Sequence, residues 1–165
     1  MLLKLNRIFN TEGAEKNFDY LLDFSKSDLA EFLPFTEPVR VYGKVKNTAD
    51  VVRLKGGATG PTFQFCDRCA CDIKGKMNTP IEHVLVTQLE DEENDELVLL
   101  ENYILDLDTL VTEDILLAMP TKLLCFDECK GLCDGCGKNL NHEKCICEKT
   151  IDPRLDVLRQ LLNNQ

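Results

Sequence analysis

The residues of this chain best suited to chemistry are its cysteines, six of which fall in the last quarter at Cys125, Cys129, Cys133, Cys136, Cys145 and Cys147. Residues 129–147 read C-K-G-L-C-D-G-C-G-K-N-L-N-H-E-K-C-I-C, which is a C-x-x-C flanked by glycine and followed by a C-x-C. Zinc prefers four soft ligands in a tetrahedron, and a C-x-x-C turn supplies two of them without strain. The spacing therefore predicts a zinc knuckle.

The glycines on either side of Cys136 explain how the backbone can fold back at this point, because Gly135 and Gly137 can adopt positive φ at no steric cost. We predict that one zinc is held by the four thiols Cys133, Cys136, Cys145 and Cys147. A second group combines the upstream C-x-x-C with two later thiols, namely Cys66, Cys69, Cys125 and Cys129. Two alternatives stay open: a single metal that leaves out Cys125 and Cys129, and a ligand role for His142.

Disulfides are the competing interpretation of these cysteines, and they require an oxidising compartment. The first residues, M-L-L-K-L-N-R-I-F-N, lack the apolar core and small-residue cleavage site of a secretory signal. We therefore expect zinc in a cytoplasmic protein with no membrane span. A dithiol redox protein using Cys66-Asp67-Arg68-Cys69 is a weaker alternative, since no helix follows to activate the thiol. Thiolate-only zinc sites are usually closed and structural, so we expect no enzyme activity.

Charge is unevenly distributed along the chain, whose formal net charge is −10. Between Arg40 and Lys76 there are eight Lys or Arg against three Asp. Between Ile81 and Thr121 there are twelve Asp or Glu and no Lys or Arg. Since phosphate attraction needs a local positive field, the candidate RNA-binding residues are those of the first stretch, Arg40, Lys44, Lys46, Arg53, Lys55 and Arg68.

Apolar and polar residues alternate in several short segments, as expected of half-buried strands. These segments are 18–24, 38–46, 51–55, one that begins with Phe63 and Phe65, 81–88 and 97–100. Asn47 to Asp50 is expected to form a turn, and the acidic run 90–96 a solvated loop. Close spacing of strands and turns predicts an antiparallel, curved sheet or partly closed barrel.

Helices are expected at three places. Ser27 can cap a helix over 28–33, Asp108 one over 109–119, and Asp152 one that starts at Pro153. The fold class is therefore α+β: an antiparallel sheet or barrel with a few helices and a cysteine-rich C-terminal lobe. We place the domains at 1–120 for the sheet with short helices, and at 121–165 for the zinc-binding lobe and C-terminal helix.

The order of these motifs resembles a known family. C-D-R-C at 66–69 precedes D-L-D-T-L-V-T-E-D-I-L-L-A-M-P at 106–120, and C-K-G-L-C-D-G-C-G-K-N-L-N and C-I-C follow. From about residue 38 to 147 the chain is similar to the YceD family, the large ribosomal RNA subunit accumulation proteins of bacteria and plastids. The resemblance implies a non-enzymatic role in ribosome biogenesis and supplies no catalytic residues.

Two kinds of partner follow from the resemblance and the charge map. The first is large-subunit ribosomal RNA or a pre-ribosomal particle, bound at the positive stretch. The second is a basic ribosomal protein, which the acidic stretch between Glu82 and Asp114 could shield. The sequence leaves open the choice between them.

Overall fold

The computed structural model describes residues 1–25, 29, 32–88 and 97–147, and the chain divides into two compact units. The first unit comprises Met1–Gln64 and Ile73–Thr121, and the second comprises Phe65–Asp72 and Lys122–Gln165. The segment Phe65–Asp72, which the sequence-based division assigns to the sheet domain, belongs to the second unit together with the later cysteines.

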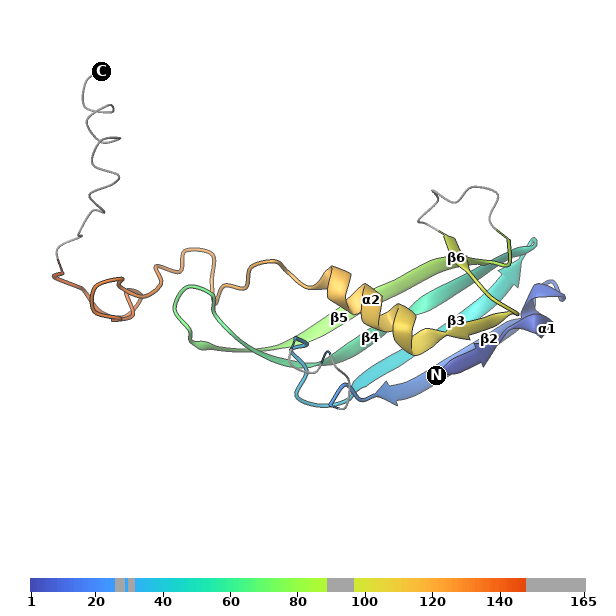
Figure 1. The fold of residues 1–165 in the computed structure, drawn as a ribbon, viewed down its shortest axis with the longest axis horizontal. Helices are drawn as coiled ribbons and strands as arrows, with labels where there is room; N and C mark the ends of the chain where they lie inside the picture. The colour runs from blue at the N-terminus through green and yellow to red at the C-terminus, as the bar shows by residue number, and fades with distance from the viewer. Residues whose placement is uncertain (26–28, 30–31, 89–96, 148–165) are drawn as a thin grey trace, which may run out of the picture. The chain divides into compact units, whose positions relative to one another are not determined.

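A five-stranded sheet dominates the first unit, in the order β2-β3-β4-β5-β6 (Figure 1). Its strands are β2 (Glu15–Leu22), β3 (Val39–Thr48), β4 (Val51–Phe65), β5 (Asp72–Val86) and β6 (Leu97–Leu99). The strand pairs β2–β3 and β3–β4 are antiparallel, as predicted, but β6 runs parallel to β5. No pairing joins β2 to β6 among the described residues, so the sheet is open and curved, and a partly closed barrel is not what forms.

Alternating side chains explain why these strands form a two-sided sheet. Val39, Val41 and Val45 are fully buried on one face of β3, while Arg40, Tyr42 and Lys44 on the other face are exposed. The predicted turn is confirmed, because β3 ends at Thr48 and β4 begins at Val51. Ala49 and Asp50 connect them with φ of 51° and 61°, as a two-residue hairpin turn requires. The strands predicted at 51–55 and at Phe63 are one continuous strand, β4.

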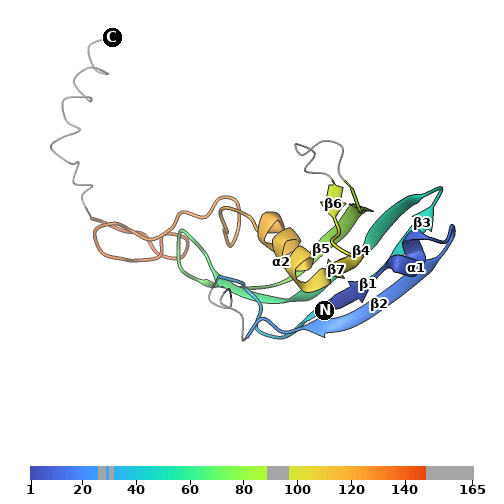
Figure 2. The same ribbon diagram turned by 45° about the vertical axis from the view of Figure 1, so that its right-hand side comes forward.

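The inner face of this sheet is covered by short elements that the sequence did not all predict. They are β1 (Leu2–Lys4), α1 (Asn6–Phe9), β7 (Ile104–Asp106) and α2 (Leu107–Ala118), with β1 and β7 paired as a separate antiparallel ribbon. Figure 2 shows them on the concave side of the large sheet. Leu107, Val111 and Ile115 of α2 are buried in the same core as the β3 valines. The opposite, outer face of the sheet therefore carries the exposed side chains.

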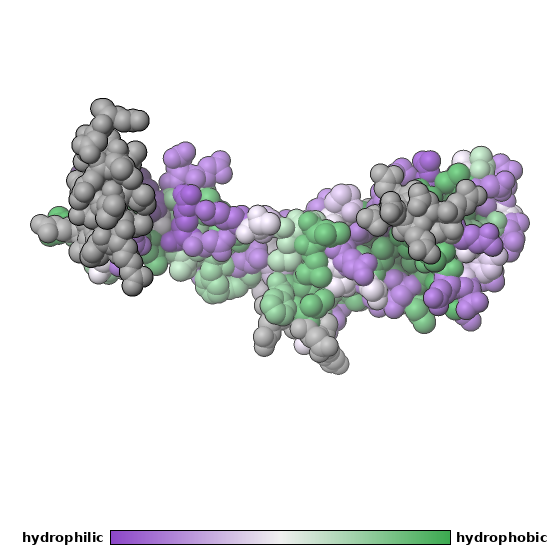
Figure 3. Space-filling view, turned by 45° about the horizontal axis from the view of Figure 1, so that its top comes forward, coloured by the Kyte–Doolittle hydropathy of each residue, from purple (hydrophilic) through white to green (hydrophobic). Residues whose placement is uncertain are grey.

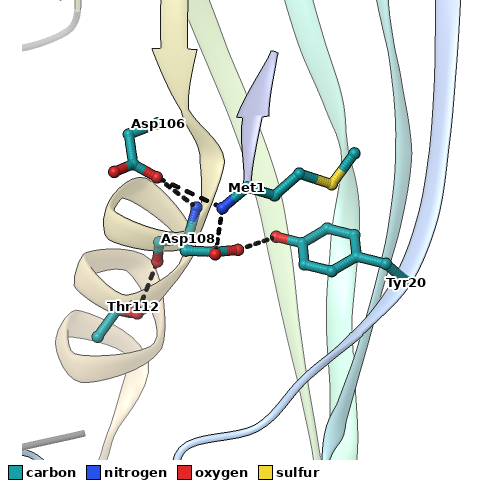
Figure 4. A network of polar contacts seen from close by, with 5 residues as sticks. All are labelled: Met1, Tyr20, Asp106, Asp108 and Thr112. Carbon is teal, nitrogen blue, oxygen red and sulfur yellow. Dashed lines mark hydrogen bonds and ion pairs between the residues drawn. The ribbon is translucent and has the colours of Figure 1, made fainter.

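The start of α2 differs from the prediction. Asp106 caps the helix, since its Oδ1 accepts a hydrogen bond from Asp108 N at 3.2 Å, and Asp108 lies in the first turn. Asp108 instead accepts a 2.7 Å hydrogen bond from the Tyr20 hydroxyl and pairs with the Met1 amino group (Figure 4). This network joins α2 to β2 at the edge of the core.

Three predicted segments involve residues outside the described structure: residues 28, 30 and 31 of the helix over 28–33, the acidic run 90–96, and the helix from Asp152. None of the helices in the described part of the chain has the length and apolar character needed to span a bilayer. Some apolar side chains stay exposed, such as Leu117 on α2 at 85%. The face drawn in Figure 3 accordingly mixes a hydrophobic band with hydrophilic residues.

Candidate metal centres and nucleic-acid interface

The last four cysteines form a compact thiol cluster in the second unit. The sulfur atoms of Cys133, Cys136, Cys145 and Cys147 all lie within 4.8 Å of one another. Cys145 Sγ is 3.2 Å from Cys133 Sγ and 3.4 Å from Cys136 Sγ. A tetrahedral site with Zn–S bonds of about 2.3 Å needs sulfur atoms about 3.8 Å apart. The donor set therefore fits one metal ion with small adjustments, and this cluster can hold one.

Five thiols meet at the other cluster of the second unit. Cys66, Cys69, Cys71 and Cys125 have their sulfur atoms within 4.8 Å of one another. The fifth, Cys129, lies 3.8 Å from Cys66 Sγ, which is the separation expected within a zinc tetrahedron. Cys71, for which the sequence offered no role, lies 3.3 Å from Cys69 Sγ. The cluster can hold a metal ion, with one thiol more than a tetrahedron needs.

The backbone turns that carry the two C-x-x-C pairs have the same hydrogen-bond pattern. Cys66 N donates to Cys71 O, and Ala70 N donates to Cys66 O, both at 2.9 Å. In the second turn Cys133 N donates to Lys138 O, and Gly137 N donates to Cys133 O, both at 2.8 Å. The residue after the second cysteine has positive φ in each case, 53° at Ala70 and 70° at Gly137. The chain therefore contains two knuckles of one design.

When the two turns are aligned on their first cysteines, Cys66 and Cys133, Cys71 takes the position that Lys138 has in the second knuckle. A lysine at that position is no metal ligand, so the parallel favours Cys129 over Cys71 as the fourth ligand of the first centre. Cys129 is also held in place: its carbonyl oxygen accepts a 2.7 Å hydrogen bond from Arg68 Nη1. Its sulfur accepts a 3.2 Å hydrogen bond from Asn141 Nδ2. The ligand assignment itself stays a prediction.

Hydrogen bonds to sulfur prepare one thiol of each knuckle for metal binding. Burial opposes ionisation of Cys66, but backbone N–H groups of Cys69, Arg68 and Cys125 outweigh it and lower its thiol pKa to about 6. The Cys145 thiol and the backbone N–H groups of Cys136 and Gly135 lower the pKa of Cys133 to about 7. Since metals bind the thiolate, each cluster contains a thiol that ionises more readily than an ordinary cysteine.

A second candidate site lies on the outer face of the large sheet in the first unit. We call it the cationic face and define it by the exposed side chains Arg40, Lys44 and Lys46 of β3 and Arg53 and Lys55 of β4. Arg40 is ion-paired with Asp19 at 2.6 Å, and Lys55 with Glu82 at 2.5 Å. These partners lower the pKa of Asp19 and Glu82.

The remaining three cations, Lys44, Lys46 and Arg53, have no ion pair among the described residues. They line an open groove of about 430 Å³ at the end of the β3–β4 hairpin, together with Val51 and Lys55. A second groove, of about 730 Å³, shares Lys44 and Lys55 with the first and extends to Tyr42 and Asp19. Two adjoining shallow hollows therefore lie on the cationic face beside Lys44 and Lys55.

Of the residues predicted to bind RNA, the structure brings five together on this face. Arg68 is the exception, because it lies in the second unit and its guanidinium donates a hydrogen bond to Cys129 O. The sequence analysis gave no role to Tyr42, although it occupies an outward position of β3 between Arg40 and Lys44. The alternation of the strand was the signal that could have identified it.

Comparison with known proteins finds relatives of this chain in mycobacteria. The chain is 26% identical to uncharacterized proteins of Mycobacterium bovis and Mycobacterium tuberculosis over 123 residues, which is 72% of this chain and 59% of theirs. An uncharacterized protein of Mycobacterium leprae is 25% identical over 130 residues, with 76% and 59% covered. The chain thus spans less than two thirds of these curated relatives, and no solved structure matches it.

A protein-family model also matches this chain. The model of the large ribosomal RNA subunit accumulation protein YceD matches residues 54–162, which is more than half of the chain. This range includes most of β4, all of β5 and α2, and all nine cysteines. It also implies, at the level of the family, a role related to ribosome biogenesis. With both knuckles and the intervening helix inside the matched range, this chain belongs to the YceD family.

Proposed function

We propose that this protein is a non-enzymatic ribosome-biogenesis factor of the cytoplasm that supports accumulation of large-subunit ribosomal RNA by binding that RNA, or a pre-ribosomal particle, through its cationic face. The observation that carries the proposal is a group of three cations around one groove, Lys44, Lys46 and Arg53, which form no ion pair within the part of the chain that the structure describes. The family membership supplies the biological context.

Charge distribution favours this face over the rest of the molecule as an RNA contact. The chain as a whole has a net charge of −10 and would repel a polyanion. A cluster of unpaired Lys and Arg produces a local positive potential, and phosphate groups are attracted to it over about 10 Å at ordinary salt concentrations. We therefore expect modest affinity that falls steeply with salt.

Zinc is the proposed cofactor, with a structural role in the second unit. Eight thiols in two knuckle-based clusters are a soft donor set of the kind that closed structural sites use. Metal binding and local folding would then be one event. On this proposal the metal stabilises the second unit and takes no part in RNA contact on the first.

Crosslinking in cells followed by sequencing of the bound RNA tests the proposal. We expect large-subunit ribosomal RNA among the crosslinked species. The triple variant Lys44→Glu, Lys46→Glu, Arg53→Glu should lose the RNA and cause precursors to accumulate, because it reverses the cations that have no protein partner. A matched control, Lys4→Glu, Arg7→Glu, Lys16→Glu, makes the same change in net charge away from the cationic face and should retain RNA.

The alternative partner, a basic ribosomal protein, provides the opposing outcome. The acidic run that suggested it lies at 90–96, outside the described structure. If the triple reversal leaves RNA association intact while neutralising Glu90, Asp91, Glu92 and Glu93 abolishes function, the protein acts through a protein partner instead. Mass spectrometry of proteins recovered with each variant identifies that partner.

A further inference from the structure

We propose that the cationic face selects single-stranded RNA, with one unpaired base stacked on the ring of Tyr42. The inference rests on the proposed RNA contact and specifies its substrate. Three features of the face support it: the exposure and fixed position of the Tyr42 ring, the floor of the groove beside it, and the placement of cations on either side.

The Tyr42 ring is exposed and yet held in place. Tyr42 is 39% exposed, between the charged side chains of Arg40 and Lys44. The ring lies against the backbone of Gly57, where a Cβ atom would come within 3.2 Å of the Tyr42 hydroxyl oxygen. The Arg40 guanidinium lies 5.6 Å from the ring centroid, and Asp19 fixes that guanidinium with hydrogen bonds of 2.6 and 3.0 Å. An aromatic ring with restricted motion loses little entropy when a base stacks on it.

The groove next to Tyr42 has sheet backbone at its base. Gly43 and Gly56 lie directly opposite each other in the β3–β4 ladder, and both line the groove of about 730 Å³. Each approaches the neighbouring backbone so closely that an added Cβ would come within 2.5 Å of Lys55 O or 2.2 Å of Tyr42 O. Their side-chain positions point to the inner face, where a Cβ on Gly43 would meet the buried Phe18 ring at 2.7 Å. On the outer face Gly57 lies directly opposite Tyr42 and adds no side chain, so a flat ligand can approach the sheet backbone beside the Tyr42 ring.

Cations flank this position at distances suited to a nucleic-acid backbone. Lys44 lies two residues from Tyr42 on the same face of β3, about 7 Å along the strand. Lys46 and Arg53 extend the positive track into the groove of about 430 Å³ at the end of the β3–β4 hairpin. In a duplex the bases are already stacked inside the helix and cannot reach an aromatic side chain. Unpaired bases can, and stacking on an aromatic ring contributes about 1–3 kcal/mol per base.

Fluorescence anisotropy with the full-length protein tests the inference. The probes are a labelled single-stranded RNA of about 12 nucleotides and the duplex that it forms with its complement. We expect the single strand to bind more tightly than the duplex. Tyr42→Ala should weaken single-strand binding roughly 5- to 150-fold, which corresponds to the loss of one stacked base. Tyr42→Phe keeps the ring and should retain wild-type affinity.

Two comparisons separate stacking from charge. Tyr42→Ala should leave the salt dependence of binding unchanged, whereas Lys44→Gln should reduce its slope by about one. Leu21→Ala removes another exposed apolar side chain, 67% exposed, from the same sheet and should have no effect. Ultraviolet crosslinking of the unmodified protein should attach a nucleotide to the peptide that contains Tyr42, which tests the contact without any substitution.

The outcomes distinguish this inference from the proposed function. If the duplex binds as tightly as the single strand, Tyr42→Ala has no effect and Lys44→Glu abolishes binding, the RNA contact stands and the stacking inference is overturned. Crosslinks that fall only on other peptides would also overturn it. If neither RNA binds the wild-type protein, the proposed contact fails as well.

Discussion

Lys46 of β3 lies directly opposite Arg53 of β4 in the antiparallel ladder, and two residues further along Lys44 lies directly opposite Lys55. Like charges at opposed positions of an antiparallel pair repel, at a cost of several tenths to 1 kcal/mol. Lys55 is relieved by its ion pair with Glu82, and the same carboxylate also attracts Arg53, but Lys46 has no ion pair among the described residues. The sheet keeps this repulsion, which is expected if the function of the cationic face requires positive charge.

The first prediction is that removing one of these cations stabilises the protein. Lys46→Thr replaces the charge with a residue that favours strands and should raise the free energy of unfolding by about 0.2–1 kcal/mol at low salt. Urea denaturation measures this gain, which should shrink in about 0.5 M salt because screening weakens the repulsion that was removed. Lys4→Thr is the control, since Lys4 faces Ile104 rather than a cation. A destabilised Lys46→Thr would contradict the argument.

The second prediction concerns the close approach of β3 and β4 at Gly43 and Gly56. A Cβ atom on Gly56 would lie 2.2 Å from Tyr42 O, a backbone atom that cannot rotate away. Gly56→Ala should therefore destabilise the first unit by about 1–3 kcal/mol. At Gly75 the nearest atom is the Thr62 hydroxyl oxygen at 3.2 Å, on a side chain that can move. Gly75→Ala should be nearly neutral in the same thermal melt, and equal losses at both sites would refute the steric explanation.

Period-two alternation made most of the large sheet predictable. Val39, Val41 and Val45 alternate with charged or polar residues, and the strand is found where that pattern lies. The parallel pairing of β6 was not predictable, because alternation gives a strand its faces but not its direction relative to a neighbour. Likewise, β1 and β7 have only three residues each and pair across 100 residues of sequence, so no local pattern marks them.

The spacing of the cysteines predicted the two knuckles but not the contacts that surround them. The C-x-x-C turns at Cys66 and Cys133 were recognisable because two thiols at that interval suit one metal. The hydrogen bond from Arg68 to Cys129 O could not be predicted, since it joins segments 61 residues apart. Cys71 lies only two residues from Cys69, but the spacing alone assigned it no role. Helix α2 was recognised, but Asp106 and Asp108 are both good caps, and sequence alone favoured the wrong one.

The third prediction concerns Tyr20, whose hydroxyl donates to Asp108 Oδ1 at 2.7 Å. Burial, together with the neighbouring carboxylate, raises the pKa of Tyr20 above its ordinary value. The neutral phenol therefore contributes stability that is present below about pH 10, where an unfolded tyrosine ionises, and is lost above it. Tyr20→Phe should cost about 1.5–3 kcal/mol at pH 7, and the difference from wild type should shrink at higher pH.

Ultraviolet absorbance of tyrosinate checks the same interaction without denaturant. The chain has three tyrosines, Tyr20, Tyr42 and Tyr103. We expect one of them to resist ionisation in the native protein, and the resistant fraction to disappear in Tyr20→Phe. If all tyrosines of the folded protein ionise together near pH 10, the hydrogen bond to Asp108 does not form as described.

The fourth prediction uses the equivalence of Ala70 and Gly137 in the two knuckles. Ala70 has φ of 53°, in the left-handed region where a Cβ atom costs roughly 1–2 kcal/mol relative to glycine. Ala70→Gly should relieve that strain and tighten zinc binding, because metal binding and folding of the second unit are proposed to be coupled. Gly137→Ala makes the reverse change at a position with no atom within 4 Å of the added Cβ, so it should weaken binding through backbone strain alone. Competition with a chelator measures both, and shifts of the same sign would contradict the equivalence.

The last prediction assigns the ligands of the first centre. If Cys66, Cys69, Cys125 and Cys129 hold the metal, Cys71→Ser should keep the zinc content of the wild-type protein and Cys129→Ser should reduce it by one. The parallel with Lys138 is the reason, since Cys71 occupies a non-ligand position of the knuckle.

Elemental analysis counts the zinc. Cobalt substitution reports the ligand set independently, because four thiolates give a charge-transfer spectrum that changes when one of them is lost. Cys136→Ser is the positive control for the second centre. If Cys71→Ser releases zinc while Cys129→Ser does not, the metal is held by the compact group of Cys66, Cys69, Cys71 and Cys125, and the two knuckles differ in function despite their common backbone.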